Sequence, residues 1–256
     1  MNLAGPNLVD LLRTPCALFL DFDGTLVDIA PEPDAVRVAP GLPAILQALQ
    51  QRLGGALAVV SGRPIHQLDD LLHPLNLPAA GVHGAERRAA DGQVVLLPTL
   101  PLQHVQDAAE ALVRQYPALL VENKRGSVAL HYRQAPELEA LCLQAMRAAV
   151  AQSEGLTLLH GKMVAEAKPL AISKGHAIAA FLQEPPFLGR TPVFFGDDVT
   201  DEAGFAVVQA GGGVGVKVGA GPTVAQHRMV NPGAVVAALE QALGASAPAP
   251  PPGPVP

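Results

Sequence analysis

The sequence predicts an α/β fold, in which helices pack on a parallel β-sheet and an α+β segment is inserted between two parts of the chain. Three observations support this prediction. Short apolar runs alternate with segments of helical periodicity in the first third of the 256 residues and again after residue 173, which is typical of parallel sheets with right-handed crossovers. Two of the apolar runs end in aspartates. The middle of the chain alternates hairpin and helix patterns instead.

The first third of the chain predicts strands that alternate with helices. Apolar runs bounded by turn residues predict the strands, and apolar residues at helical spacing predict the helices. In chain order we expect a strand at 16–20, a helix at 41–54, a strand at 56–62, a helix at 64–73 and a short strand at 79–84.

The middle of the chain predicts an insert, residues 83–169, with a different organisation. We expect a helix at 101–117, a hairpin at 119–133 that turns at Arg125 and Gly126, a second helix at 136–152 and a second hairpin at 156–169. Two hairpins and two helices predict a small antiparallel sheet with helices on one face.

The first pattern then returns, so residues 1–82 and 170–245 are expected to form the core around the insert. Its second part predicts a helix at 174–183, strands at 191–198 and 212–219, and a closing helix at 233–243. Residues 246–256 are rich in proline and alanine, a composition typical of a flexible tail.

Composition excludes several classes of function. Residues of the AVILMFWYC set make up 49% of the chain and charged residues 16%, whereas disordered proteins show the opposite balance. A net charge of -6 with few aromatic residues and no tryptophan argues against a nucleic-acid partner. No apolar run approaches the roughly 20 residues that span a bilayer, so we expect no membrane partner.

The cysteines and the first residues point to the cytoplasm. Cys16 and Cys142 are the only cysteines, too few for a disulfide framework or a zinc site, and isolated thiols fit a reducing compartment. The first fifteen residues lack the basic, apolar and cleavage regions of a secretion signal. We therefore expect a cytoplasmic protein.

Two predicted strands run directly into aspartates. The run ending at Leu20 is followed by Asp21 and Asp23, which share a face because residues i and i+2 of a strand do. For this pair alone, turn or helix capping is an equally good interpretation. A second run repeats the device with Asp197, Asp198 and Asp201. Carboxylates gathered at one edge of a sheet require a cation, and oxygen ligands suit Mg²⁺.

Groups able to bind phosphate are expected at the same edge. Ser61, Gly62 and Arg63 follow the strand at 56–62 and offer a hydroxyl and backbone N–H groups, and Lys174 begins a helix, where charge and helix N-terminus both favour an anion. Each alone is better interpreted as a turn residue or a surface lysine. Together with the aspartates they favour phosphoryl chemistry.

The motifs DFDGTL, SGR, the lysine at position 174 and GDDVTD resemble, in order and spacing, the four motifs of the haloacid-dehalogenase superfamily of phosphohydrolases. The resemblance covers about residues 18–201 and implies a Rossmann-like hydrolase core with an inserted cap of the second type. It implies that Asp21 is the nucleophile and Asp23 the general acid and base. The remaining implied roles are Mg²⁺ binding by the Asp21 carboxylate, the Asp23 backbone carbonyl and Asp197, support of that site by Asp198 and Asp201, and phosphate binding by Ser61, Gly62 and Lys174.

The insert carries polar residues at strand spacing. Glu122 and Lys124 share one strand face, and Val164, Glu166 and Lys168 share another. Such residues on a sheet that covers the site would recognise hydroxyl groups. The alternative interpretation is that these residues only form a sheet face exposed to water, and periodicity alone gives it about a third of the weight.

The segments GVHGAERR, VENKRGSVALHYR, GKMVAEAKP and GDDVTDEAGF resemble the trehalose-6-phosphate phosphatase family in particular. That resemblance implies that Glu122, Lys124 and Glu166 bind the disaccharide, with Arg63 and His83 near the cleft between core and cap. Position 123 departs from the family, because it is Asn where an acidic residue is usual.

The implied activity is Mg²⁺-dependent hydrolysis of trehalose 6-phosphate to trehalose and phosphate through an aspartyl-phosphate, a step of trehalose biosynthesis. It leaves room for functional coupling to a trehalose-6-phosphate synthase. Two alternatives stay open: a phosphatase for another sugar phosphate, of the sucrose-phosphate or mannosylglycerate-phosphate type, and a non-catalytic regulatory module of the same fold.

Overall fold

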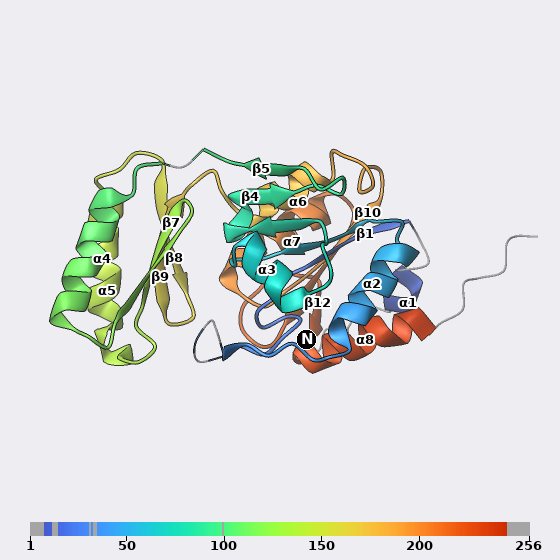
Figure 1. The fold of residues 1–256 in the computed structure, drawn as a ribbon, viewed down its shortest axis with the longest axis horizontal. Coiled ribbons are helices and arrows are strands. Elements are labelled where there is room, and N and C mark those ends of the chain that lie inside the picture. The colour runs from blue at the N-terminus through green and yellow to red at the C-terminus, as the bar shows by residue number, and fades with distance from the viewer. Residues whose placement is uncertain (1–7, 12–14, 31, 33–34, 99, 245–256) are drawn as a thin grey trace, which may run out of the picture.

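A computed structural model (Figure 1) describes residues 8–11, 15–30, 32, 35–98 and 100–244. Eight strands form one sheet in the order β12-β11-β10-β1-β2-β3-β4-β5, and four form a second in the order β6-β7-β9-β8. The predicted α/β fold class with a separate antiparallel sheet is confirmed. The predicted tail at 246–256 lies outside the described residues.

Six strands of the large sheet are parallel, from β12 to β3. All five residues of β1 are 0% exposed, and because successive side chains point to opposite faces, both faces of this strand are covered. The strands of the large sheet are β1 (Cys16–Leu20), β2 (Leu57–Val60), β3 (Ala79–Gly81), β4 (Glu86–Arg88), β5 (Val94–Leu96), β10 (Thr191–Gly196), β11 (Val214–Val218) and β12 (His227–Met229).

Helices α2 and α8 pack together, as do α6 and α7. Apolar residues at helical spacing produce these contacts; in α2 the buried residues are Leu42, Leu46 and Leu49. The helices outside the second sheet's segment are α1 (Leu8–Leu11), α2 (Leu42–Arg52), α3 (Ile65–Leu72), α6 (Lys174–Phe181), α7 (Glu202–Ala210) and α8 (Pro232–Gly244), with the short 3-10 helices η2 (Val82–Gly84) and η4 (Val199–Asp201).

The large sheet extends further along the chain than the sequence predicts. β4 and β5 pair antiparallel with β3 and with each other, whereas the sequence predicts residues 83–169 in the insert. The chain reverses after β3 through Val82 and His83, which both have positive φ, and β4 then pairs with the open edge of β3. Strands of three residues carry too short a pattern to assign to either sheet.

The four-stranded sheet and its helices form a cap beside the core. Its members are α4 (Gln103–Gln115), β6 (Leu120–Lys124), β7 (Ser127–His131), η3 (Pro136–Leu138), α5 (Glu139–Val150), β8 (Leu156–Gly161) and β9 (Val164–Pro169). Figure 1 shows α4 and α5 on the sheet face turned away from the core. The other face of the sheet is directed toward the core, as a cap over a site would be. Within the described part of the chain no helix is long and apolar enough to cross a membrane.

Candidate active site between core and cap

Asp21 lies at the end of β1, deep in the core. Its side chain is buried, its Oδ1 accepts a hydrogen bond from Lys174 Nζ at 2.6 Å, and its Oδ2 accepts one from Thr25 Oγ1 at 2.9 Å. Lys174 begins α6, so the predicted meeting of strand end and helix start is observed. The expected nucleophile is therefore held by two donors.

Asp197 and Asp201 reach the same place from the end of β10. Asp201 is 0% exposed, and its Oδ2 accepts hydrogen bonds from the backbone N–H groups of Asp197 and Asp198 at 3.0 and 2.9 Å. Its Oδ1 accepts one from Lys174 Nζ at 2.7 Å. Asp201 thus fixes the turn that presents Asp197, whose own carboxylate is also buried.

These three residues form an aspartate cluster (Asp21, Asp197 and Asp201). One ligand oxygen of each lies within 4.8 Å of the others, an arrangement that could hold a metal ion. Burial raises the pKa of Asp21 well above its usual range, and the charges of Asp201 and Asp197 raise it further while Lys174 lowers it. Burial also raises the pKa of Asp197. Three buried carboxylates need more positive charge than Lys174 supplies, and a hard cation with oxygen ligands can provide it.

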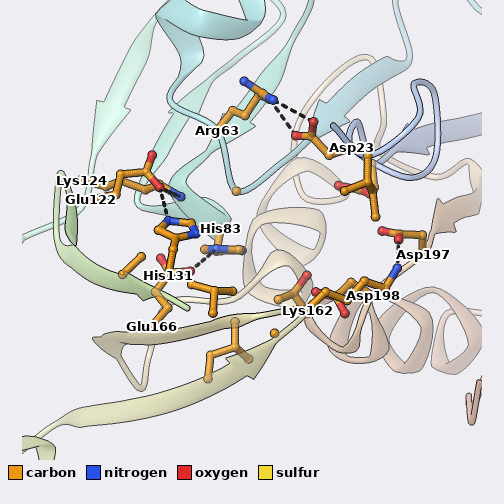
Figure 2. A pocket seen from close by; sticks show the side chains of 18 of the residues that line it. Asp23, Arg63, His83, Glu122, Lys124, His131, Lys162, Glu166, Asp197 and Asp198 are labelled. Atoms are coloured by element: carbon orange, nitrogen blue, oxygen red, sulfur yellow. Dashed lines mark hydrogen bonds and ion pairs between the residues drawn. The ribbon is translucent and has the colours of Figure 1, made fainter. Parts of the chain in front are cut away.

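Lysines supply part of the missing charge. Although burial alone would lower the pKa of Lys174, the Asp201 and Asp21 carboxylates raise it above its usual range. Lys162, from the hairpin between β8 and β9, places its Nζ 2.5 Å from Asp197 Oδ2 (Figure 2). A third lysine, Lys217, is buried and donates to the backbone carbonyl of Asp197. Even with three lysines nearby, the pKa values of Asp21 and Asp197 stay raised, so the carboxylates remain short of positive charge.

Gly24 allows the Asp197 side chain to lie directly against the backbone, because glycine has no Cβ. Its φ is +82°, and a Cβ at this position would lie 2.2 Å from Asp197 Oδ2. We expect Gly24→Ala to lower the free energy of unfolding by about 1–2 kcal/mol through backbone strain and by a further 1–3 kcal/mol or so through overlap with Asp197. Denaturant unfolding measures the change.

The control for this prediction is Gly92→Ala. Gly92 has a similar φ of +87° but nothing within 4 Å of its Cβ position, so it reports backbone strain alone. Equal losses of stability for the two variants would show that the Asp197 side chain moves away from the new methyl group without lowering the free energy of unfolding further.

Asp21 and Asp23 line the same cleft, but the Asp23 carboxylate has different partners and is not part of the aspartate cluster. β1 ends at Leu20, before either aspartate, so strand alternation does not extend to them. Asp23 instead accepts two hydrogen bonds from Arg63, Nε to Oδ2 at 2.7 Å and Nη2 to Oδ1 at 2.8 Å, as Figure 2 shows. Both residues line this cleft, which lies between the core and the cap.

The predicted phosphate-binding residues occupy different positions around the cluster. Lys174 and Gly62 line the cleft. Ser61 is buried, and its Oγ accepts a hydrogen bond from the Arg63 backbone N–H at 3.1 Å. Gly62 lies under the ring of His83, because a Cβ at Gly62 would be 2.8 Å from His83 Cε1.

The cap supplies the opposite wall of the cleft. Glu122, Lys124 and Glu166 all line it, together with Asp21, Asp197 and Asp198 of the core. Lys124 Nζ is 3.3 Å from Glu122 Oε2. The structure therefore brings the predicted sugar-binding side chains and the aspartate cluster to one cleft.

Glu166 of β9 and His83 of the core join across the cleft. His83 Nε2 donates to Glu166 Oε2 at 3.0 Å, and both side chains are buried. Although burial would raise it, the pKa of Glu166 is held well below its usual range, chiefly by His83. Glu166 Oε1 and His83 Nδ1 are buried and form no hydrogen bond of normal geometry in the structure as described, although the nearby Ser127 hydroxyl also lowers the pKa of Glu166.

Among the cleft residues that were not singled out from the sequence, two contact acidic residues of the predicted site. His131 Nε2 donates to Glu122 Oε2 at 3.0 Å, and Lys162 contacts Asp197. The contact between His131 and Glu122 could have been found from the hairpin register, because the turn at Arg125 and Gly126 places both side chains on one face of the hairpin. No local pattern marks the second, since the partners are far apart in the chain.

Comparison with known proteins identifies the family. The model of the family described as trehalose-phosphatase matches residues 19–231. "Trehalose-6-phosphate phosphatase" of Escherichia coli (strain K12) is 48% identical over 221 residues, 85% of this chain and 83% of that protein. "Probable trehalose-phosphate phosphatase" of Sinorhizobium fredii is 46% identical over 205 residues, 79% of this chain and 77% of that protein.

The fold has a counterpart among solved structures. The C-terminal domain of C. albicans trehalose-6-phosphate phosphatase superposes with a TM-score of 0.86, covering 95% of this chain and 98% of that one at 23% identity. At this identity the match supports the fold alone. The family model and the relatives carry the assignment, and on their evidence the chain belongs to the trehalose-phosphatase family.

Proposed function

We propose that the chain hydrolyses trehalose 6-phosphate to trehalose and phosphate, with Asp21 as nucleophile. The observation that carries the proposal is one cleft lined by both the aspartate cluster and the polar face of the cap sheet. In the first step an Asp21 oxygen would form a bond to phosphorus as the bond to the sugar oxygen breaks. Asp23, protonated and released from Arg63, which binds both of its oxygens in the structure, would give its proton to the leaving oxygen. It would then take a proton from the water that attacks phosphorus and breaks the bond to Asp21.

We further propose Mg²⁺ as the cation, held by Asp21, Asp197 and the backbone carbonyl of Asp23, with Asp198 and Asp201 in support. Three buried carboxylates with oxygen atoms within 4.8 Å of one another support this assignment. A bound divalent ion would neutralise charge on the carboxylates and the phosphoryl group. Because Lys174, Lys162 and Lys217 already contact the aspartates, the loaded cluster would be positive and would attract a phosphate dianion.

Ser61, Gly62 and Lys174 would hold the phosphoryl oxygens, and Lys174 is placed for this by its contact with Asp21. For the residues at the cleft wall we propose sugar contacts by Arg63, His83, Glu122, Lys124 and Glu166. The cap in this proposal begins after β5 and ends at β9, so its boundary lies later than residue 83. Both cysteines are buried and unpaired, which supports a reducing, cytoplasmic location.

Phosphate release tests the proposal. Trehalose 6-phosphate, sucrose 6-phosphate, mannosylglycerate phosphate and glucose 6-phosphate are compared at equal concentrations with Mg²⁺. We expect trehalose 6-phosphate to give the highest kcat/KM. Preference for another sugar phosphate would assign the cap a different sugar, and no turnover of any phosphate ester would favour the non-catalytic alternative.

Replacing Glu122 should reduce turnover of trehalose 6-phosphate far more than turnover of p-nitrophenyl phosphate, which has no sugar. A missing acceptor leaves a hydroxyl unpaired in the cleft, which costs on the order of 1–3 kcal/mol, or roughly 10- to 100-fold in kcat/KM. Glu122→Ala is assayed on both esters. Glu154→Ala is the matched control, because Glu154 is an exposed residue of the cap outside the cleft lining. Equal losses on both esters would assign Glu122 to the fold instead.

A further inference from the structure

Each of the two glutamates on the cap sheet has one oxygen bound by a histidine (Figure 2). His131 Nε2 donates to Glu122 Oε2 at 3.0 Å, and His83 Nε2 donates to Glu166 Oε2 at the same distance. One histidine comes from the cap and the other from the core. The same arrangement, a histidine bound to one oxygen of a glutamate, therefore occurs twice around the same cleft and is formed by different elements.

The register of β6 and β7 creates the pair in the cap. Glu122 lies opposite Ala129, and His131 is two residues beyond Ala129 on the same face. Diagonal neighbours of this kind lie within reach of long side chains. Ala129 also lies opposite Glu166 of β9, so a single methyl group separates the two glutamates. This small residue leaves space beside each carboxylate for its histidine.

The histidines engage only one oxygen of each carboxylate. Lys124 Nζ also lies nearest Oε2 of Glu122, at 3.3 Å, so His131 and Lys124 approach the same oxygen. On Glu166, Oε1 is buried and forms no hydrogen bond of normal geometry in the described structure, with the Ser127 hydroxyl as a donor nearby. A carboxylate that is held through one oxygen keeps its other oxygen in a defined direction. That oxygen can accept a hydrogen bond from a ligand, because an ionised carboxylate only accepts hydrogen bonds.

We propose that His131 is a positioning residue, which holds Glu122 so that its second oxygen meets a hydroxyl group of the bound sugar. This inference rests on the proposed function. Burial would raise the pKa of Glu122, but His131 and Lys124 lower it below its usual value, which keeps the acceptor ionised. Free rotation of Glu122 would otherwise be lost only when the sugar binds, at a cost in affinity.

A direct contact between His131 and the sugar is the competing explanation, since His131 also lines the cleft. The two explanations differ in additivity. A residue that acts through Glu122 has nothing left to position once Glu122 is removed, whereas a residue that touches the sugar itself still contributes. A double-mutant cycle therefore separates them.

The cycle compares the unaltered chain, His131→Ala, Glu122→Ala and the double variant, with kcat and KM for trehalose 6-phosphate. We expect His131→Ala to raise KM about 10-fold, the equivalent of one charge-assisted hydrogen bond, with a smaller change in kcat. In the Glu122→Ala background the same change should alter KM less than about twofold. His131→Gln, which keeps an N–H donor, should recover part of the loss.

His160→Ala is the matched control. His160 Nε2 lies 2.8 Å from Glu139 Oε1 in the same cap, but neither residue lines the cleft. Its removal should leave KM unchanged. Thermal unfolding of all variants shows which remain folded, and if His131→Ala unfolds, the cycle is completed with His131→Gln and His131→Phe.

Equal loss from His131→Ala in both backgrounds would overturn the proposal in favour of direct contact. A KM that His131→Ala leaves unchanged would exclude both a positioning role and a direct contact. Failure of the proposed function is detected separately, by the panel of sugar phosphates on the unaltered chain. If another sugar phosphate is preferred, the cycle is run on that substrate and its coupling decides the role of His131. An unaltered chain that prefers no sugar phosphate over p-nitrophenyl phosphate would overturn both proposals.

Discussion

Asp21→Asn should abolish hydrolysis of trehalose 6-phosphate, with a loss in kcat of at least about 10⁴-fold. The amide cannot form the acyl-phosphate bond, because its nitrogen and carbonyl oxygen are poor nucleophiles. The fold should survive. The Asn carbonyl oxygen can accept from Lys174 as Asp21 Oδ1 does at 2.6 Å, and the amide N–H can donate to Thr25 Oγ1 in place of the hydrogen bond now made at 2.9 Å. The variant also removes one charge from a cluster that is short of positive charge.

Asp70→Asn is the matched control, because it makes the same change at an exposed position of α3. Phosphate release and thermal unfolding are measured for both variants. Trapping of phosphate on the chain by acid quench should detect a covalent intermediate in the unaltered protein and none in Asp21→Asn. Hydrolysis by Asp21→Asn within tenfold of the unaltered chain would exclude a covalent role for this residue.

The core and its carboxylate edge were predictable because their causes are local. Apolar runs such as Cys16–Leu20 become strands, and parallel strands end at one edge, where the residues after them meet. This reasoning correctly joined Asp21 with Asp197. It did not predict the partner of the Asp23 carboxylate, Arg63, because the strand stops before the aspartates and the chain turns at Gly24, whose φ is positive.

The contacts between core and cap could not be derived in this way. Lys162 and Asp197 are 35 residues apart in sequence, and their meeting depends on how the cap sits over the core, which no short pattern encodes. The same holds for His83 and Glu166. The pair of His131 and Glu122 is different, since a turn at Arg125 and Gly126 sets Glu122 opposite Ala129. That register was within reach of the sequence.

Removal of divalent metal should stop hydrolysis of trehalose 6-phosphate, and added Mg²⁺ should restore it. Loss of charge stabilisation worth several kcal/mol predicts a fall in rate of roughly 100-fold or more. The aspartate cluster supplies the reason: its oxygens lie within 4.8 Å of one another, and burial raises the pKa of Asp21 and Asp197, so the ionised cluster is costly without a cation. Phosphate release in excess chelator, and after titration with Mg²⁺, measures the effect.

The same charge imbalance predicts a change in stability that does not depend on turnover. A ligand at 100 times its Kd stabilises the folded state by about 2.7 kcal/mol, which raises Tm by roughly 5–10 °C for a chain of this size. Asp197→Asn should remove most of this response to Mg²⁺ while the protein still folds, because it takes a charge out of a crowded cluster. Asp70→Asn should keep the full response. Full activity in excess chelator, together with a Tm that Mg²⁺ leaves unchanged, would show that the surrounding lysines neutralise the cluster and that the chemistry requires no metal.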